Sequence, residues 1–163
     1  PMVESRVHGL SFGPLEPGRE AEFTQLQNHV FEGSWGFCPN TTSDILQLLN
    51  TPGYNHDGVV IAHRAKSVAG YCWTGKRRSL NGKSGEMIGR VHMMGVVQEF
   101  RGQGLAKHIL WAGLRHLAEQ GDEMVELTVD NENAAACAVY KRAGFKLKTP
   151  LVWYEKQIRQ ESQ

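Results

Sequence analysis

The chain has 163 residues, the usual length of one domain. Hydrophobic residues make up 40% and charged residues 21%, a balance that excludes a disordered chain. No apolar run approaches the roughly 18 residues that span a bilayer, and the first residues lack the apolar segment of a secretory signal. The net charge of +1 argues against nucleic-acid binding.

The three cysteines are odd in number and widely spaced, at Cys38, Cys72 and Cys137. This pattern indicates free thiols in a reducing compartment, so a cytoplasmic location is expected. Neither Cys-x-x-Cys nor His-x-x-x-His occurs, and no metal site is expected.

The spacing of apolar residues predicts strands and helices in a mixed order. Antiparallel strands come first and βαβ units last, which favours an α+β or mixed α/β sheet. In chain order we expect a strand at 7–12, a helix at 19–31, a short helix starting within 40–44 and ending at 52–53, a hairpin of 58–64 and 67–74, a polar loop at 75–84, a strand at 86–97, a turn at 98–104, a helix at 105–120, a strand at 125–129, a helix at 131–143 and a last hairpin of 145–147 and 151–155.

The turn at 98–104 is the most informative segment. Gly102 and Gly104 can adopt φ > 0 and let a ligand approach the backbone closely. The helix that follows begins with unpaired N–H groups and the positive end of its dipole, which favour an anion such as pyrophosphate. Arg101 and Lys107 add positive charge. The segment therefore predicts an anion site at the start of this helix.

Three phosphate-binding patterns compete for the glycine-bearing segments. The dinucleotide pattern Gly-x-Gly-x-x-Gly fails, because position 107 is Lys and no hydrophobic βαβ unit opens the chain. A Walker-type loop could end at 82–84, but Arg77 replaces its first Gly and the segment lies between strands. The acyl-coenzyme A signature Arg/Gln-x-x-Gly-x-Gly/Ala is satisfied by residues 101–106. A glycine-rich turn that binds nothing is the remaining alternative.

A second motif lies further along the chain, within 129–145. It has the form Asn-x-x-Ala-x-x-x-Tyr-x-x-x-Gly-Phe, matched by Asn133, Ala136, Tyr140, Gly144 and Phe145. With both motifs in this order and spacing, the chain resembles the Gcn5-related N-acetyltransferase (GNAT) superfamily. The predicted element order extends the resemblance over nearly the whole chain.

The resemblance implies an α/β fold (an α+β mixed sheet) with four helices and about seven strands, splayed between the fourth and fifth strands. Acetyl-coenzyme A (acetyl-CoA), the acyl-donor co-substrate, would place its pantetheine arm in the splay. The residues implied to bind it are Gly95, Val96 and Val97 along the arm, the amides of Arg101, Gly102, Gln103, Gly104, Leu105 and Ala106 at the pyrophosphate, and Asn133 and Tyr140.

Transfer of an acetyl group from a thioester to an amine needs a neutral amine, a stabilised oxyanion and a thiolate that leaves. A backbone N–H of the splayed fourth strand could polarise the thioester carbonyl. The phenol of Tyr140, with an ordinary pKa near 10, could protonate the departing thiolate. Packing of a helix face is the alternative role for this side chain.

The general base is predicted on the strand at 86–97, where a period of two puts Glu86, Arg90, His92 and Met94 on one face. His92 is the candidate, because an ordinary pKa near 6.5 suits proton transfer directly or through water. A histidine satisfied by a neighbour in the sheet is an equal alternative. Glu86, Glu32 and ordered water are the other candidate bases.

The family resemblance places the acceptor between the first two helices and the fourth strand. Trp35 and Glu32, in the segment after the first helix, are predicted to bind it. Phe37, Tyr71 and Trp73 could line the same pocket or fill the core.

We expect an N-acetyltransferase that acts on a primary amine of a small molecule by direct transfer in a ternary complex. No nucleic-acid or membrane partner is expected, and a homodimer is common in the family.

Short segments at 17–20, 70–73 and 94–96 resemble the C-terminal domain of mycothiol synthases, whose Glu near position 90 is replaced here by Arg90. The alternatives are a mycothiol-synthase-like activity and a GNAT domain that binds acyl-CoA without catalysis. We expect one domain over 1–163, or one half of a tandem protein.

Overall fold

The computed structural model describes residues 3–5, 9–34, 36–78 and 87–148. The chain divides into two compact units, 1–130 and 131–163. The described part of the first unit holds a sheet and three α-helices, and that of the second holds one α-helix.

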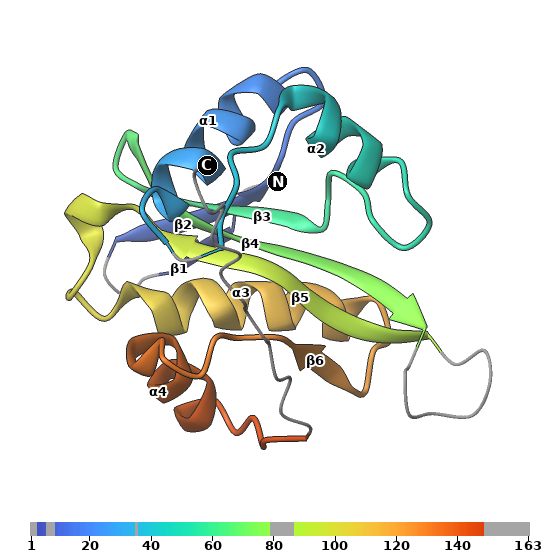
Figure 1. Cartoon of the computed structure of the whole chain (residues 1–163), viewed down its shortest axis with the longest axis vertical. Helices are drawn as coiled ribbons and strands as arrows, with labels where there is room; N and C mark the ends of the chain where they lie inside the picture. The colour runs from blue at the N-terminus through green and yellow to red at the C-terminus, as the bar shows by residue number, and fades with distance from the viewer. Residues whose placement is uncertain (1–2, 6–8, 35, 79–86, 149–163) are drawn as a thin grey trace, which may run out of the picture. The chain divides into compact units, whose positions relative to one another are not determined.

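Six strands form the sheet of the described residues, in the order β1-β2-β3-β4-β5-β6 (Figure 1). All neighbours are antiparallel except β5 and β6, which are parallel. The strands are β1 (Val3–Ser5), β2 (Leu10–Pro14), β3 (Val59–Arg64), β4 (Ser67–Arg78), β5 (Met87–Val96) and β6 (Val125–Leu127).

Helices cover both faces of this sheet, as Figure 1 shows for the first unit. α1 (Glu20–Phe31) and α2 (Thr42–Leu49) pack on one face, and α3 (Leu105–Glu119) packs on the other. The core beneath α1 and α2 is built around three large aromatic side chains, Phe23, Tyr71 and Trp73, each no more than 2% exposed. Phe23 meets both other rings edge to face, at centroid distances of 5.1 and 5.4 Å.

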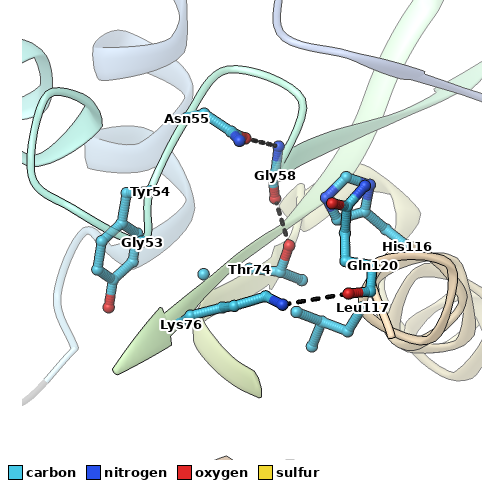
Figure 2. Close-up of a pocket in the computed structure, with 10 residues that line it drawn as sticks. Gly53, Tyr54, Asn55, Gly58, Thr74, Lys76, His116, Leu117 and Gln120 are labelled. Atoms are coloured by element: carbon cyan, nitrogen blue, oxygen red, sulfur yellow. Dashed lines mark hydrogen bonds between the residues drawn. The ribbon is translucent and has the colours of Figure 1, made fainter. Parts of the chain in front are cut away.

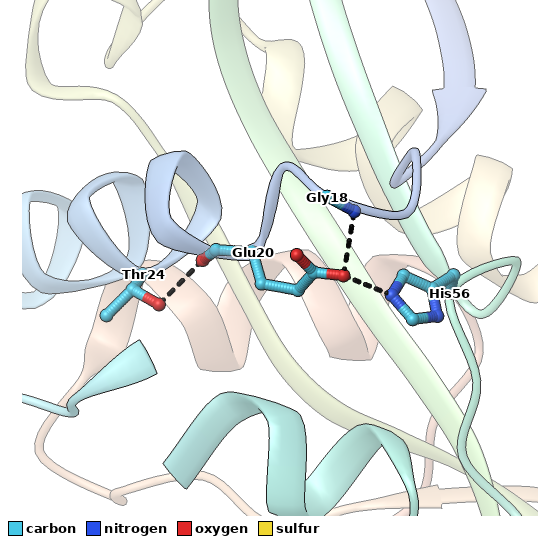
Figure 3. Close-up of polar contacts among 4 residues, drawn as sticks. All are labelled: Gly18, Glu20, Thr24 and His56. Atoms are coloured by element: carbon cyan, nitrogen blue, oxygen red, sulfur yellow. Dashed lines mark hydrogen bonds and ion pairs between the residues drawn. The ribbon is translucent and has the colours of Figure 1, made fainter. Parts of the chain in front are cut away.

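Polar contacts fix where α1 and α2 begin. α2 starts with a capping box, in which the Thr41 hydroxyl accepts from the Asp44 amide and the Asp44 carboxylate accepts from the Thr41 amide. In α1, the Glu20 carboxylate accepts from the Gly18 amide at 3.0 Å and contacts His56 at 2.7 Å (Figure 3). His56 belongs to the segment before β3, so this contact holds the start of α1 beside that segment.

The predicted helices at 19–31, 105–120 and 131–143 are confirmed as α1, α3 and α4 (Ala134–Arg142), and the short second helix as α2. β4 is longer than predicted, because residues 75–78, expected in a loop, pair with β5. The pattern missed this extension because its polar side chains have partners: Arg77 makes two hydrogen bonds to Glu126 of β6, at 3.0 and 2.6 Å. β1 was not predicted.

The mixed fold with four α-helices is confirmed, whereas the described residues contain six of about seven expected strands. The predicted strand at 145–147 is absent: these residues form no strand in the structure. A strand requires a paired neighbour, and the expected partner at 151–155 lies outside the described residues. The expected parting of the fourth and fifth strands corresponds to β5 and β6, which pair only from Gly89↔Val125 to Val91↔Leu127.

A β-bulge in β5 changes which side chains share a face. Trp73 of β4 pairs with Met93 and Thr74 pairs with Val91, so His92 is an additional residue. His92 and Met93 consequently both face the α1 side, where the Gln27 amide contacts the Met93 sulfur at 3.1 Å. The prediction that Met94 shares a face with His92 is therefore wrong, because alternation resumes only after the bulge. Glu86 lies outside the described residues.

No helix in the described part of the chain is both long and apolar enough to cross a membrane.

Packing of α3 on the sheet depends on the absence of a side chain at Gly113. A Cβ there would lie 2.3 Å from the Cys72 sulfur, closer than any real contact. We expect Gly113→Ala to lower the free energy of unfolding by about 1–3 kcal/mol through overpacking. The double variant Gly113→Ala/Cys72→Ala should be less destabilised than the sum of its single variants, measured by urea unfolding. Strict additivity would contradict this packing.

Candidate functional site

The turn between β5 and α3 has the backbone conformation that the sequence predicts. A short 3-10 helix at Gln98–Phe100 precedes it, and the Arg101 amide donates to the Gln98 carbonyl at 3.1 Å. Gly102 and Gly104 both have φ of 74°, in the left-handed region that glycine adopts without strain. The Gln103 side chain braces the turn, since it donates to the Glu99 carbonyl at 3.0 Å and accepts from Arg64.

The start of α3 is open to an anion. Gly104 is its N-cap and provides no side-chain cap, and the first turn carries no acidic residue. The first amides of a helix have no partner within the helix, and the helix dipole makes this end positive. Lys107 adds an exposed cation in the first turn. By contrast, α2 and α4 have side-chain caps. The start of α3 therefore combines amide donors, dipole and charge in one place.

The end of β5 provides backbone groups beside this turn. The Val97 amide bonds to the Ala69 carbonyl at 3.0 Å, which fixes the alternation of this strand. Gly95 and Val97 direct their amides toward β4, so Val96 directs its amide to the other side, where pairing with β6 has ended. Of the three residues predicted to pair with an extended ligand, Val96 thus has the suitable orientation.

The Arg101 guanidinium bridges two segments that the sequence did not connect. Its Nε donates to the Val96 carbonyl at 3.0 Å, and its Nη2 donates to the Val30 carbonyl in the last turn of α1 at 2.7 Å. Gly95 permits this approach, since a Cβ there would lie 2.2 Å from the Val30 side chain. No sequence signal pointed to this bridge, because it joins residues 71 positions apart.

A cavity of about 350 Å³ lies at the end of α1 and in the segment that follows. Glu32, predicted to bind the acceptor, lines it, and 82% of its side chain is exposed. Phe37 is another wall, and its ring lies 5.4 Å from that of Phe31. Trp35, the other predicted acceptor residue, lies outside the described residues. The remaining lining residues are Asn28, His29, Gly33 and Pro39.

His92 is held between two aromatic rings. Its ring lies 5.0 Å from that of Trp73 and 5.4 Å from that of Tyr54, both edge to face. Burial, and secondly the charge of Arg90, lowers the pKa of His92 to about 4. The imidazole is therefore neutral at pH 7. The guanidinium of Arg90 is itself partly buried, which lowers its pKa, and its Nη2 lies 3.4 Å from the Thr128 hydroxyl.

Two predicted site residues belong to the second unit. Asn133 is the N-cap of α4, where its side-chain oxygen accepts from the Ala136 amide at 3.0 Å. Tyr140 is in the same helix, and its ring meets that of Phe145 at 5.9 Å. Gly144 follows the C-cap of this helix and has φ of 91°.

A second cavity, of about 140 Å³, lies at the opposite end of α3 (Figure 2). One wall is formed by the end of α3 and the others by β4 and the segment before β3. The lining residues are Gly53, Tyr54, Asn55, Gly58, Thr74, Gly75, Lys76, His116, Leu117 and Gln120. The Gly58 carbonyl accepts from the buried Thr74 hydroxyl at 2.8 Å. A helix of 15 residues is about 22 Å long, so this cavity is remote from the glycine turn. No cluster of three or more potential metal ligands occurs among the residues described.

A mixed sheet that parts beside a glycine turn at the start of a helix is the architecture of the acyltransferases that the sequence resembles. Residues 21–145 match the model of the Acetyltransferase (GNAT) family. This match covers more than half of the chain, and the chain belongs to that family.

Curated relatives share sequence across most of this chain. A mycothiol acetyltransferase of Thermobispora bispora is 34% identical over 154 residues, covering 91% of this chain and 50% of the relative. One of Amycolatopsis mediterranei is 38% identical over 139 residues, covering 84% of this chain and 46% of the relative. The chain thus spans about half the length of the curated relatives it matches.

Solved structures share the fold at low sequence identity. An aminoglycoside N-acetyltransferase in complex with CoA is 18% identical, with a TM-score of 0.69 over 96% of this chain and 100% of the other. An aminoglycoside acetyltransferase from an uncultured soil metagenomic sample is 17% identical, with a TM-score of 0.68 over 95% and 100% of the two chains.

The left-handed conformation of Gly104 gives a direct test of the turn. A Cβ at Gly104 would meet open space among the described atoms, so Gly104→Ala introduces strain of about 1–2 kcal/mol and no clash. We expect it to weaken acetyl-CoA binding about tenfold in calorimetric titration, because the turn must shift to relieve that strain.

Gly121→Ala is the matched control. Gly121 has φ of 83°, also faces open space and lies at the far end of α3. Gly121→Ala should lower the free energy of unfolding about as much as Gly104→Ala does, and it should leave the affinity for acetyl-CoA unchanged. Equal losses of affinity in both variants would contradict a local role of the Gly104 turn.

The pKa of His92 predicts a pH dependence of stability. An unfolded histidine takes up a proton near pH 6.5, whereas folded His92 resists it until about pH 4. His92 therefore does not change the free energy of unfolding above about pH 6.5. As the pH falls toward 4, only the unfolded state binds the proton, and the free energy of unfolding decreases by up to about 3 kcal/mol. His92→Gln should remove that part of the slope in urea unfolding between pH 4 and 7. Parallel pH profiles for both proteins would contradict the burial of this imidazole.

Proposed function

We propose that the protein is an acetyl-CoA-dependent N-acetyltransferase that transfers the acetyl group directly to a primary amine of a small molecule in a ternary complex. The observation that carries this proposal is the uncapped start of α3, with its left-handed glycines, next to the unpaired side of β5. Membership of the GNAT family supports it.

The donor would bind along two described features. The amides from Gly102 to Ala106 would hold the pyrophosphate, because they lie at the positive end of α3. The Val96 amide would pair with the pantetheine arm, in the place that β6 leaves. The Arg101 amide already donates to Gln98, so the proposal assigns Arg101 to the turn's architecture. Bound acetyl-CoA supplies the thioester that the amine attacks.

The acceptor would enter the cavity after α1. Glu32 offers an exposed carboxylate there, suited to attract an ammonium group, and Phe37 offers an apolar wall. The ring of Phe31 connects this wall to β5, since one of its carbons lies 3.4 Å from the Cβ position of Gly95. Trp35 is also proposed to contact the acceptor, because it follows α1 in the sequence between Glu32 and Phe37.

The amine must lose a proton before it attacks. His92 would accept it through water while neutral, although a pKa of about 4 makes this imidazole a weak base. Arg90, its neighbour on the strand, cannot serve as a base because a guanidinium stays protonated. We therefore expect the rate to depend on the fraction of the amine that is already neutral, and to rise with pH up to the pKa of the acceptor.

Tyr140 is proposed to protonate the departing thiolate. Tyr140→Phe removes the hydroxyl and keeps the ring that contacts Phe145. We expect kcat to fall about a hundredfold, the usual contribution of an acid catalyst, with the Kd of acetyl-CoA unchanged. Thiol release and calorimetry on the same samples separate the two effects. An unchanged kcat would exclude this role.

The whole proposal is tested by titration with acetyl-CoA, followed by a thiol-release screen over a panel of amines. Binding with amine-dependent release is expected. Binding without release from any amine would favour a domain that binds acyl-CoA without catalysis. Absence of binding would overturn the assignment of the glycine turn.

A second candidate is mycothiol-acetyltransferase-like activity, favoured by relatives of that name at 30–39% identity. The acceptor of those relatives therefore belongs in the amine panel. Arg90 stands where the resemblance led us to expect a glutamate base, so this activity would need another route for the proton.

A further inference from the structure

We propose that Arg101 is a positioning residue that couples the donor turn to the acceptor cavity, so that coenzyme binding orders the segment after α1. This inference rests on the proposed function, because it assigns a regulatory connection between the two halves of the same site.

The connection begins at the end of α1. The last carbonyls of a helix have no donor within the helix and need partners elsewhere. Two are supplied here: the Val30 carbonyl accepts from Arg101 Nη2 at 2.7 Å, and the Phe31 carbonyl accepts from the Ser34 amide at 2.9 Å. Arg101 is a cation at the negative end of the helix dipole, which strengthens its bond.

The segment that follows is held at its other end too. The Asn28 side chain exchanges two hydrogen bonds with the Asn40 backbone, both 2.9 Å long, and the side-chain amide of Asn40 donates to the Gln27 side-chain oxygen at 2.8 Å. Between these anchors lie Gly33 and Gly36, both with positive φ. The cavity-lining segment is therefore fixed at its far end by α1, and at its near end by contacts that include Arg101.

The same guanidinium is attached to the donor site. Arg101 begins the glycine turn, and its Nε donates to the carbonyl of Val96, the residue whose amide faces the opening of the sheet. Gly102 and Gly104 give the backbone of this turn more conformational freedom than other residues would. A pyrophosphate bound to the turn would restrict the Arg101 backbone further, and so strengthen the contact that its side chain already makes with Val30.

Coupling follows from this arrangement. When the turn is already ordered, less conformational entropy is lost as Arg101 bridges to α1. Binding of the coenzyme would therefore reduce the entropy cost of ordering the segment that the acceptor contacts. Linkage makes the effect reciprocal: whatever affinity the coenzyme adds for the acceptor, the acceptor adds for the coenzyme.

Hydrogen exchange of the whole 163-residue chain measures the coupling without a known acceptor. The Ser34 and Phe37 amides are hydrogen-bonded to Phe31 and Ser34 carbonyls, and they report order in the segment. Saturating coenzyme A should slow their exchange about tenfold in the wild type, within the usual range for coupled sites.

Arg101→Lys keeps the positive charge at the turn but replaces the planar fork that spans two carbonyls. We expect this variant to bind coenzyme A within a few-fold of wild type and to lose the slowed exchange at saturation. Lys107→Gln is the converse control, since Lys107 lies in the first turn of α3: it should weaken binding and keep the slowed exchange once saturated.

The outcomes separate the two proposals. If coenzyme A binds and the Ser34 and Phe37 amides exchange unchanged, or if Arg101→Lys responds as the wild type does, the coupling is wrong and the proposed function stands. If titration shows no coenzyme A binding, the proposed function fails and this inference fails with it.

Discussion

β5 pairs on both sides only from Gly89 to Val91, and the arrangement of the site depends on the point where its second neighbour ends. At the paired end, Arg77 of β4 reaches across to Glu126 of β6 in a half-buried ion pair. Beyond Val91, β5 is held on one side by β4, so its backbone alternation leaves the Val96 amide directed to the open side. The parting of two strands thus leaves backbone groups at the end of β5 without a strand partner on one side.

Close packing on both faces keeps this open strand in place. Glycines at two positions admit neighbours that a Cβ would exclude: Val30 of α1 approaches β5 at Gly95, and α3 approaches Cys72 of β4 at Gly113. The first approach also brings the carbonyl of Val30 within reach of Arg101. The core and the candidate site therefore depend on the same contacts, and a change that moves α1 would alter the glycine turn as well as the core.

The sequence predicts well what depends on local pattern. The spacing of apolar residues predicts α1 and α3, the cap residues before Ile45 predict α2, and the positive φ of Gly102 and Gly104 follows from the motif at 101–106. The sequence did not predict geometry that depends on contacts between distant segments. The bulge at His92, which moves Met94 to the other face, depends on register against Trp73. The Arg101 bridge depends on how closely α1 packs, and neither has a signature in nearby residues.

The environment of His92 illustrates why a residue type does not define a role. The ordinary pKa of histidine, near neutrality, makes its imidazole a candidate general base in any sequence. Between Tyr54 and Trp73, and next to Arg90, this imidazole is instead kept neutral down to a pH of about 4. Burial of this kind lowers its strength as a base while it stabilises the packing of β5 at the bulge. Under the proposed function, the amine's own ionisation would therefore control the rate, and selection of the acceptor would depend on the cavity after α1 rather than on the strength of a protein base.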